Sequence, residues 1–380
     1  MKLKKMIPYS RHNISKEDIK NVLKVIKSDF LTTGPEVEKF EKKLSKEFKS
    51  KYVSCVNSAT SGLHLACLSL GLKKGDYLWT SAISFVASAN CGLYCGANID
   101  FVDIEIDTLN ISIIDLEKKL YLAKLKKKLP KIIVVVHLAG NPCDMQKIYN
   151  LKKKYGFKII EDASHAIGAK YENFSIGDCK FSDACIFSFH PVKIITSAEG
   201  GAVLTNSSKI FKDINLLRSH GIDKKTNKGS WFNKQISLGF NYRMNDIEAA
   251  LGSSQLNRLD KFLLYRNKVS SFYKEKLNKK VNIQKINEYN YCSYHLFVVM
   301  VKESLRNKIF KKLREEGFFV NLHYMPIYRH DYYKKNFLIN SKNYPNAEKY
   351  YKTAISIPNF YDLKLKSANK VIKLINSFYI

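Results

Sequence analysis

The residue best placed to do chemistry is Lys193, which lies between two apolar runs in the stretch ACIFSFHPVKIITSAEGGAVLTN (184–206). Burial of a lysine lowers the pKa of its amine, and the neutral amine is a nucleophile toward carbonyl carbon. Ser188 and His190 precede Lys193, and a Glu199-Gly200-Gly201 turn follows it, where glycines allow close backbone approach. This environment favours imine chemistry over the solvation of a surface charge.

Two acidic residues, Glu161 and Asp162, interrupt the apolar run of FKIIEDASH (157–165). Ligands of an open α/β sheet collect at the carboxyl ends of its strands, where a buried carboxylate needs a partner. We therefore expect both acids to point at a ligand, with capping of the next helix or metal binding as the alternatives. No set of metal-ligand residues accompanies them, so we expect no metal.

Small and hydroxyl residues (57–61) connect a short apolar strand to a helix. The free N–H groups of a helix N-terminus bind phosphate well, although ordinary capping by serine gives the same pattern. A phosphate cradle, a carboxylate and an enclosed lysine are together what pyridoxal 5′-phosphate requires. In such a site the phosphate anchors the cofactor, the carboxylate keeps the pyridine nitrogen protonated, and the lysine forms the Schiff base.

Alternating strands and helices must position these residues. Apolar runs predict strands at 51–57, 76–80, 98–104, 132–140, 157–165, 183–191 and 200–206, most of them separated by helical segments. This pattern predicts an α/β fold with a mostly parallel sheet of six or seven strands. One long helix is expected over 246–278 and an antiparallel strand over 291–301. We therefore expect a large domain at 1–250 and a smaller C-terminal α+β domain at 251–380.

The composition excludes several classes of protein. The chain has 64 Lys and Arg against 34 Asp and Glu, but the lysines are spread along helix faces such as 116–129. We expect a solvated basic surface and no nucleic-acid partner. The eight cysteines show no zinc-ligand spacing, and reduced, mostly buried thiols are expected. Without a long apolar run or a signal-peptide pattern, we expect a cytoplasmic protein and no membrane partner.

The order of several motifs resembles the DegT/StrS group of sugar aminotransferases over almost the whole chain. These motifs are FLTTGPEVEKFE, NSATSGLHLA, ISFVASAN, EDASHAIGA, FSFHPVKIITSAEGGAV, LGFNYRMNDIEAALG and NLHYMPIY. The resemblance implies fold type I of the pyridoxal-phosphate-dependent transferases (aspartate aminotransferase-like), with a seven-stranded sheet. It also implies a homodimer with shared active sites.

The resemblance assigns roles to individual residues. Lys193 is implied to form the Schiff base and to carry protons in the 1,3-proton shift, and Asp162 to pair with the pyridine nitrogen. His165 is implied to lie near the phenolic oxygen, and Phe85 to stack on the ring. The residues implied to hold the phosphate are Ala59, Thr60, Ser61 and Ser188. Asn241 is implied to reach the phosphate from the partner subunit. Those implied to contact a nucleotide sugar are Tyr9, Asp29, Phe30, Leu31, Thr32, His323, Tyr324, Met325 and Pro326.

Within the group, the most similar members transfer an amino group from L-glutamate to a UDP-linked 4-keto-6-deoxy-2-acetamido hexose in pseudaminic acid (nonulosonate) biosynthesis. Some relatives carry histidine in place of the Schiff-base lysine and dehydrate the sugar. Here that position is Lys193, and His190 does not displace it, so transamination is favoured. Two alternatives stay open. The substrate could be another nucleotide-linked keto sugar (dTDP-linked, GDP-linked or 3-keto), or the protein could be a non-catalytic regulator that binds pyridoxal phosphate.

Overall fold

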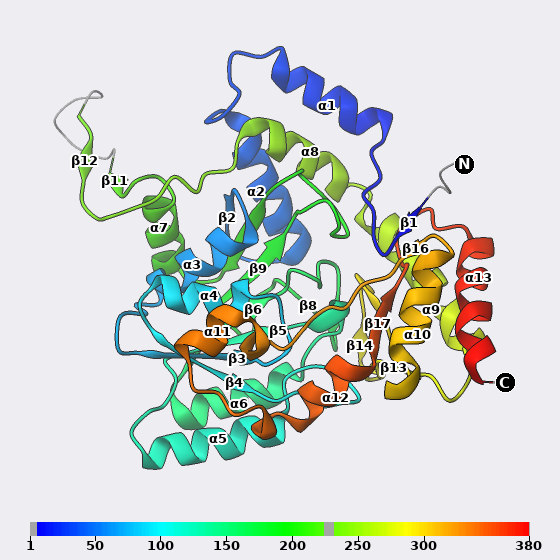
Figure 1. Ribbon diagram of the computed structural model, residues 1–380. Helices are drawn as coiled ribbons and strands as arrows, with labels where there is room; N and C mark the ends of the chain where they lie inside the picture. Colours follow the sequence, from blue (N-terminus) through cyan, green and yellow to red (C-terminus); the bar gives the residue numbers. More distant parts are fainter. Residues whose placement is uncertain (1–5, 224–231, 380) are drawn as a thin grey trace.

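The computed structural model describes residues 6–223 and 232–379. Its centre is a seven-stranded sheet in the order β2-β10-β9-β6-β5-β3-β4 (Figure 1). The strands are β2 (Tyr52–Val56), β3 (Tyr77–Ser81), β4 (Asn98–Val102), β5 (Ile132–Val136), β6 (Lys158–Asp162), β9 (Ala184–Ser188) and β10 (Gly201–Thr205). Only β10 runs antiparallel to its neighbours, which are β2 and β9. The predicted mostly parallel sheet is confirmed.

Helices cover both faces of this sheet and also pack in the C-terminal part of the chain. They are α1 (Lys16–Ile26), α2 (Pro35–Phe48), α3 (Ala59–Ser69), α4 (Ala87–Tyr94), α5 (Ile113–Leu125), α6 (Met145–Tyr155), α7 (Ser208–Leu217), α8 (Asp246–Leu256), α9 (Leu259–Lys276), α10 (Glu303–Glu315), α11 (Asp331–Asn336), α12 (Pro345–Thr353) and α13 (Leu365–Asn376). Among the described residues, no helix is both long enough and apolar enough to cross a membrane.

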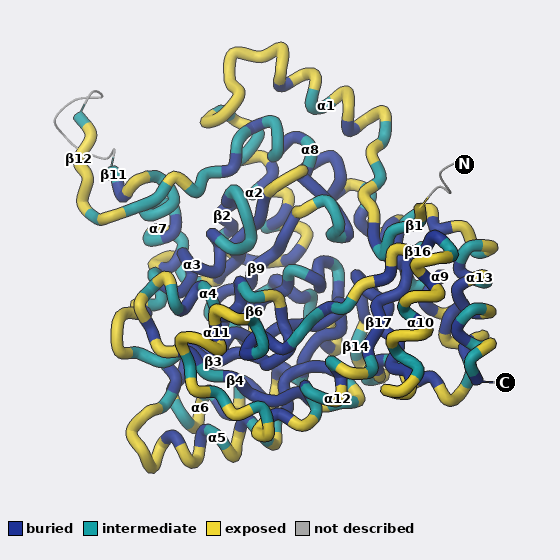
Figure 2. The backbone as a smooth tube through the Cα atoms, viewed as in Figure 1, coloured by how far each residue is buried: buried dark blue, intermediate teal, exposed yellow. Residues whose placement is uncertain are grey.

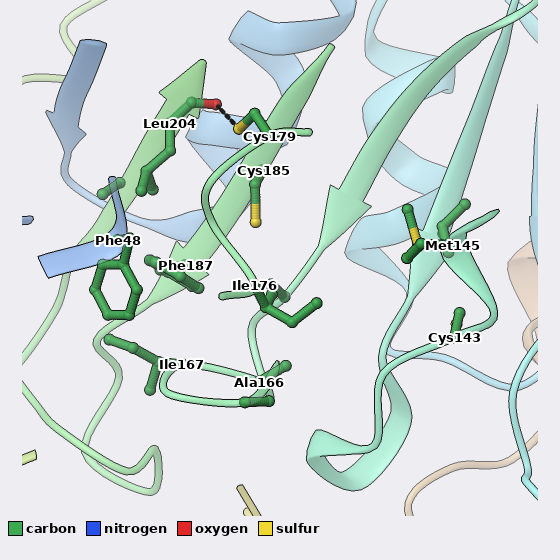
Figure 3. Packing of buried hydrophobic residues seen from close by; sticks show 14 of the residues in the cluster. Phe48, Cys143, Met145, Ala166, Ile167, Ile176, Cys179, Cys185, Phe187 and Leu204 are labelled. Carbon is green, nitrogen blue, oxygen red and sulfur yellow. Dashed lines mark hydrogen bonds between the residues drawn. The ribbon is translucent and has the colours of Figure 1, made fainter. Parts of the chain in front are cut away.

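Alternation along the strands divides the core into two layers. In β5, Ile133 and Val135 pack on the face covered by α2, α5, α6 and α8, whereas Val134 and Val136 pack on the face covered by α3, α4 and α7. Figure 3 shows part of the first layer, where the rings of Phe48 and Phe187 lie 4.8 Å apart between centroids. Both faces are therefore closed, and the strands are buried (Figure 2).

A smaller sheet follows in the C-terminal part, built from β13 (Asn282–Ile283), β15 (Phe297–Met300) and β17 (Ala354–Ile357). With α9, α10 and α13 it encloses a hydrophobic cluster of its own. However, Tyr333 of α11 and Tyr350 of α12 pack in the cluster of the large sheet. The domain boundary near residue 250 stays a prediction.

Short strand pairs complete the fold. They are β1 (Ile7–Pro8) with β16 (Phe318–Phe319), β11 (Ile222–Asp223) with β12 (Lys234–Gln235), and β7 (Lys170–Tyr171) with β8 (Phe174–Ser175) and β14 (Asn290–Tyr291). The β1–β16 pair joins the N-terminal segment to the C-terminal part of the chain.

The single helix expected over 246–278 is wrong, because the structure has two helices there. The break falls at Arg258, whose φ of −112° and ψ of 9° leave the helical region. Its guanidinium forms an ion pair with the buried Asp18 at 2.5 Å, a contact that is distant in sequence. The strand expected over 291–301 is also interrupted, since Tyr294 adopts a positive φ of 46° between β14 and β15.

Candidate active site

A cavity of about 440 Å³ opens at the carboxyl ends of β6 and β9. The start of α3, the loop after β9 and the segment 321–324 form its other walls. Ten of the predicted site residues line it: Tyr9, Ala59, Thr60, Phe85, Asp162, His165, Ser188, Lys193, His323 and Tyr324. The fold thus brings together residues from six separate parts of the sequence.

The other predicted residues lie outside the cavity wall. Ser61 is directly behind it, where its hydroxyl donates to Asn57 Oδ1 at 2.6 Å. Asn241 is exposed, and its carbonyl accepts from Asn57 Nδ2 at 3.4 Å. The remaining residues that do not line the cavity are Asp29, Phe30, Leu31, Thr32, Met325 and Pro326.

The start of α3 forms one end of the cavity. Ser58 caps the helix by accepting from the Ser61 amide at 3.1 Å, and the amides of Ala59 and Thr60 fall in the first turn, where helix geometry leaves N–H groups without helical partners. Gly201 packs tightly behind them, because a Cβ there would lie 2.6 Å from the Ala59 nitrogen. Together with Ser188, which pairs with Gly201 across the sheet, these groups suit a phosphate.

Lys193 lies on the cavity wall in a loop that is held at several points. Its amide donates to the His190 carbonyl at 2.9 Å, and the preceding carbonyl, of Val192, accepts from Ser10 Oγ at 2.6 Å. Burial lowers the pKa of Lys193 to about 8, while the nearby Asp162 carboxylate opposes this shift. A larger fraction of the amine is therefore neutral at neutral pH than in an exposed lysine.

The Asp162 carboxylate is held by hydroxyl groups that the sequence analysis missed. Ser88 Oγ donates to Asp162 Oδ2 at 2.6 Å, and Ser164 Oγ donates to Asp162 Oδ1 at 2.6 Å. Ser84 extends this network with a hydroxyl 2.7 Å from that of Ser88. Ser88 is fully buried on α4, so it has no access to water in place of this contact. Its serine-rich surroundings, SAISFVASAN, were the available signal.

The expectation that both acids of β6 point at the ligand is wrong for Glu161. Successive side chains of a strand point to opposite faces, so Asp162 faces the cavity and Glu161 faces the other layer. There Glu161 Oε2 lies 2.8 Å from His137 Nε2, and its Oε1 accepts from Ser182 at 2.5 Å. Glu161 is a structural carboxylate with its own partners.

His165 has its tautomer fixed by its neighbours. Its Nδ1 accepts from the Ala139 amide at 3.3 Å, so the ring proton lies on Nε2 and is donated to Tyr324 Oη at 3.0 Å. Burial and the charges of Lys193 and His323 hold the pKa of His165 well below its ordinary value. His295, also missed from the sequence, packs against it with ring centroids 4.4 Å apart and the ring planes tilted by 45°. His165 is thus a neutral, oriented donor.

These residues fit pyridoxal 5′-phosphate. The phosphate-binding end, the amine and the carboxylate border one cavity, and Phe85 supplies an aromatic face beside them. A buried carboxylate with two hydroxyl donors suits a protonated pyridine nitrogen, which gives it a cationic partner. Fold and cavity together define a pyridoxal-phosphate-dependent enzyme of fold type I.

The chain belongs to the DegT/DnrJ/EryC1/StrS aminotransferase family, which it matches over residues 12–376. It is 40% identical over 373 residues, covering 96% of both chains, to the UDP-4-amino-4,6-dideoxy-N-acetyl-beta-L-altrosamine transaminase of Campylobacter jejuni serotype O:23/36. The structure of Helicobacter pylori PseC, an aminotransferase of pseudoaminic acid biosynthesis, aligns with a TM-score of 0.88 at 32% identity, covering 98% of this chain and 99% of that one.

Streptococcus pneumoniae Spr1654 in its PMP form aligns with a TM-score of 0.90 at 27% identity, covering 98% of each chain. The same protein is known in a PLP form, with a TM-score of 0.88. The predicted family, fold type and cofactor are therefore confirmed: the protein is a pyridoxal-phosphate-dependent aminotransferase.

Replacing Ser88 with alanine removes one hydrogen bond to the Asp162 carboxylate and is expected to lower kcat about tenfold, the usual effect of losing a bond to a charged group. We also expect the pH dependence of the bound cofactor's absorption spectrum to change, because the Asp162 carboxylate then has one hydrogen bond fewer. Ser69→Ala is a matched control, since this buried serine donates to the Ala66 carbonyl of its own helix. Unchanged kcat and spectrum in Ser88→Ala would contradict this role.

The lowered pKa of Lys193 predicts how cofactor attachment depends on pH. Only the neutral amine attacks, so the rate at which the cofactor-free protein attaches pyridoxal phosphate should rise with pH and level off above about 8. Stopped-flow absorbance over a pH series measures this midpoint. A rate that keeps rising toward the ordinary lysine value near 10.4 would contradict the effect of burial.

Proposed function

We propose that the protein transfers an amino group from L-glutamate to C4 of a UDP-linked 4-keto-6-deoxy-2-acetamido hexose. The product would be UDP-4-amino-4,6-dideoxy-N-acetyl-β-L-altrosamine, for pseudaminic acid biosynthesis. The observation that carries this proposal is Lys193 beside Asp162 in one cavity, in a chain that matches a transaminase of this name along nearly its whole length. A lysine here, rather than histidine, supports transamination.

The cofactor supplies an electron sink and carries the amino group between donor and acceptor. Lys193 Nζ holds and returns the proton at C4 of the sugar, a task for which a pKa near 8 is suited. The Asp162 carboxylate, fixed by Ser88 and Ser164, holds the proton of the pyridine nitrogen. His165 donates its Nε2 proton on the side of the cavity where Tyr324 lies.

Aromatic residues are proposed to orient the sugar. The rings of Tyr9 and His323 lie 4.5 Å apart, and those of Phe85 and Tyr324 lie 5.9 Å apart between centroids, so both pairs border the same cavity. His323 is itself held by a 2.9 Å hydrogen bond to Ser356. These aromatic rings are proposed to contact the sugar or the base of the substrate.

We propose that two copies of the chain form the working enzyme. On α1, Ile19, Leu23 and Ile26 recur at helical spacing and are 46–53% exposed. Phe30 and Leu31 continue this apolar surface, and Figure 2 shows α1 projecting from the body of the molecule with little covering it. A second copy would bury this surface and bring the exposed Asn241 to the cofactor phosphate of its partner.

The segment 29–32 and Met325–Pro326 are proposed to contact the nucleotide in this assembly. UDP sugars and L-glutamate are cytoplasmic metabolites, so the cytoplasm is the proposed location. The experiment below also tests the alternative substrates, which are keto sugars linked to other nucleotides.

Purified enzyme incubated with L-glutamate and a panel of UDP-, dTDP- and GDP-linked keto sugars should aminate the UDP-linked 4-keto sugar fastest. Mass spectrometry identifies the nucleotide, and NMR identifies the aminated carbon. Lys193→Ala should bind pyridoxal phosphate without covalent attachment and show no turnover, and full activity in it would refute the assigned role. A preference for another nucleotide, or amination at C3, would refute the proposed substrate but not the aminotransferase activity.

Shared sites can be tested with mixed dimers. Co-expression of Lys193→Ala chains with Asn241→Asp chains should restore about a quarter of wild-type activity, because half of the dimers are mixed and each contains one intact site. Co-expression of Lys193→Ala with Asp162→Asn is the matched control and should restore none, because these two residues border the cavity of the same chain. Equal activity from both mixtures would contradict a contribution by Asn241 of the partner subunit.

A further inference from the structure

Two packed helices, α3 and α4, carry a group of three cysteines and one histidine that the proposed reaction does not use. On α3, His64 and Cys67 are three residues apart, and Cys91 on α4 is four residues before Cys95 at the C-cap of that helix. Each pair therefore lies on one face of its helix. The His64 ring lies 5.4 Å from that of Tyr94, the residue before Cys95, so this face of α3 packs against the end of α4. Cys67 and Cys91 belong to one buried cluster, and Cys95 packs against that cluster.

Exposure separates the three thiols. Cys67 and Cys91 are fully buried, whereas Cys95 is partly exposed at the end of α4. His64 is fixed on its other side by Tyr242, whose hydroxyl lies 3.4 Å from Nδ1, and by the rings of Tyr94 and Phe240. A reagent in solution can thus reach Cys95, while Cys67 on the packed helix α3 is buried behind the surface.

The contacts of Cys95 also favour its reactive form. The neighbouring Cys67 and His64 lower the pKa of Cys95 to about 6, which favours its thiolate form. By contrast, burial raises the pKa of the thiols of Cys55, Cys143, Cys179, Cys185 and Cys292. Selective reaction at one thiol follows from both access and charge.

We propose that Cys95 and Cys67 form a peroxide-sensitive dithiol that oxidises to a disulfide between α3 and α4. In the first step the Cys95 sulfur attacks one oxygen of a hydroperoxide, the O–O bond breaks, and the other oxygen leaves and takes up a proton. The resulting sulfenic acid is then attacked by the Cys67 sulfur. The S–O bond breaks, an S–S bond forms, and water leaves with the Cys67 proton. Two thiols are oxidised, and one peroxide is reduced.

This disulfide would join two helices that both reach the active site. The first turn of α3 carries Ala59 and Thr60, and α4 carries Ser88, which holds Asp162. The proposal concerns thiol chemistry alone, so it stands or falls independently of the sugar substrate.

Mass spectrometry of the cofactor-loaded enzyme tests the proposal. Under limiting iodoacetamide at neutral pH, Cys95 should be alkylated at least about tenfold faster than the five buried thiols named above. After mild treatment with hydrogen peroxide and blocking of free thiols, peptide mapping should find one disulfide, between Cys67 and Cys95. Equal alkylation rates, a disulfide between Cys67 and Cys91, or oxidation without any disulfide would each overturn the proposal.

Variants assign the two roles. Cys95→Ser should prevent the disulfide, and Cys67→Ser should leave a Cys95 sulfenic acid that dimedone traps. Cys143→Ser is the matched control and should oxidise like the wild type, since this buried thiol donates to the Val136 carbonyl elsewhere in the sheet. Each variant is first checked for the wild-type absorption of bound pyridoxal phosphate, so that misfolding is recognised. A disulfide that persists in Cys95→Ser would refute the attacking role of Cys95.

Discussion

Burial of the Asp162 carboxylate is the constraint on which the rest of the active site depends. A carboxylate taken out of water is costly unless hydrogen bonds and a positive charge replace its hydration. Ser88 and Ser164 supply the hydrogen bonds, and Lys193 lies close enough to interact electrostatically with the carboxylate. In the proposed site, the protonated ring nitrogen of the cofactor would complete this balance. Helix α4 and the loop after β9 must therefore keep their positions relative to β6.

The arrangement of the sheet is the second condition. Because β10 runs against its neighbours, the loop that carries Lys193 connects two adjacent antiparallel strands, and its two ends lie side by side at Ser188 and Gly201. The same glycine leaves room for the first turn of α3. The amine and the phosphate-binding turn thus share one anchoring point in the core.

Much of this arrangement could be predicted from the sequence. Apolar runs located the seven strands, and an acid at the end of β6 and an enclosed lysine after β9 are features of local sequence. The serine-rich stretch around Ser88 was a signal, but its partner could not be predicted from it, because the contact with Asp162 arises only when the fold brings α4 against β6. The separation of Glu161 from Asp162 was available from strand alternation, which the sequence interpretation overlooked. The break at Arg258 carries no proline or glycine signal, and the side chain there pairs with Asp18, far away in the chain. Asn241 stays a prediction, because its proposed contact belongs to another copy.

The hydrogen bond from Ser10 to the carbonyl of Val192 has a consequence for the order in which the protein matures. The segment around Ser10 leaves the ribosome before the loop that it supports, yet β1 pairs with β16, which is made after both. The loop that holds Lys193 therefore receives one of its supports only after the C-terminal part has been synthesised. A nascent chain that has already formed the large sheet would hold its reactive amine less firmly than the finished enzyme does.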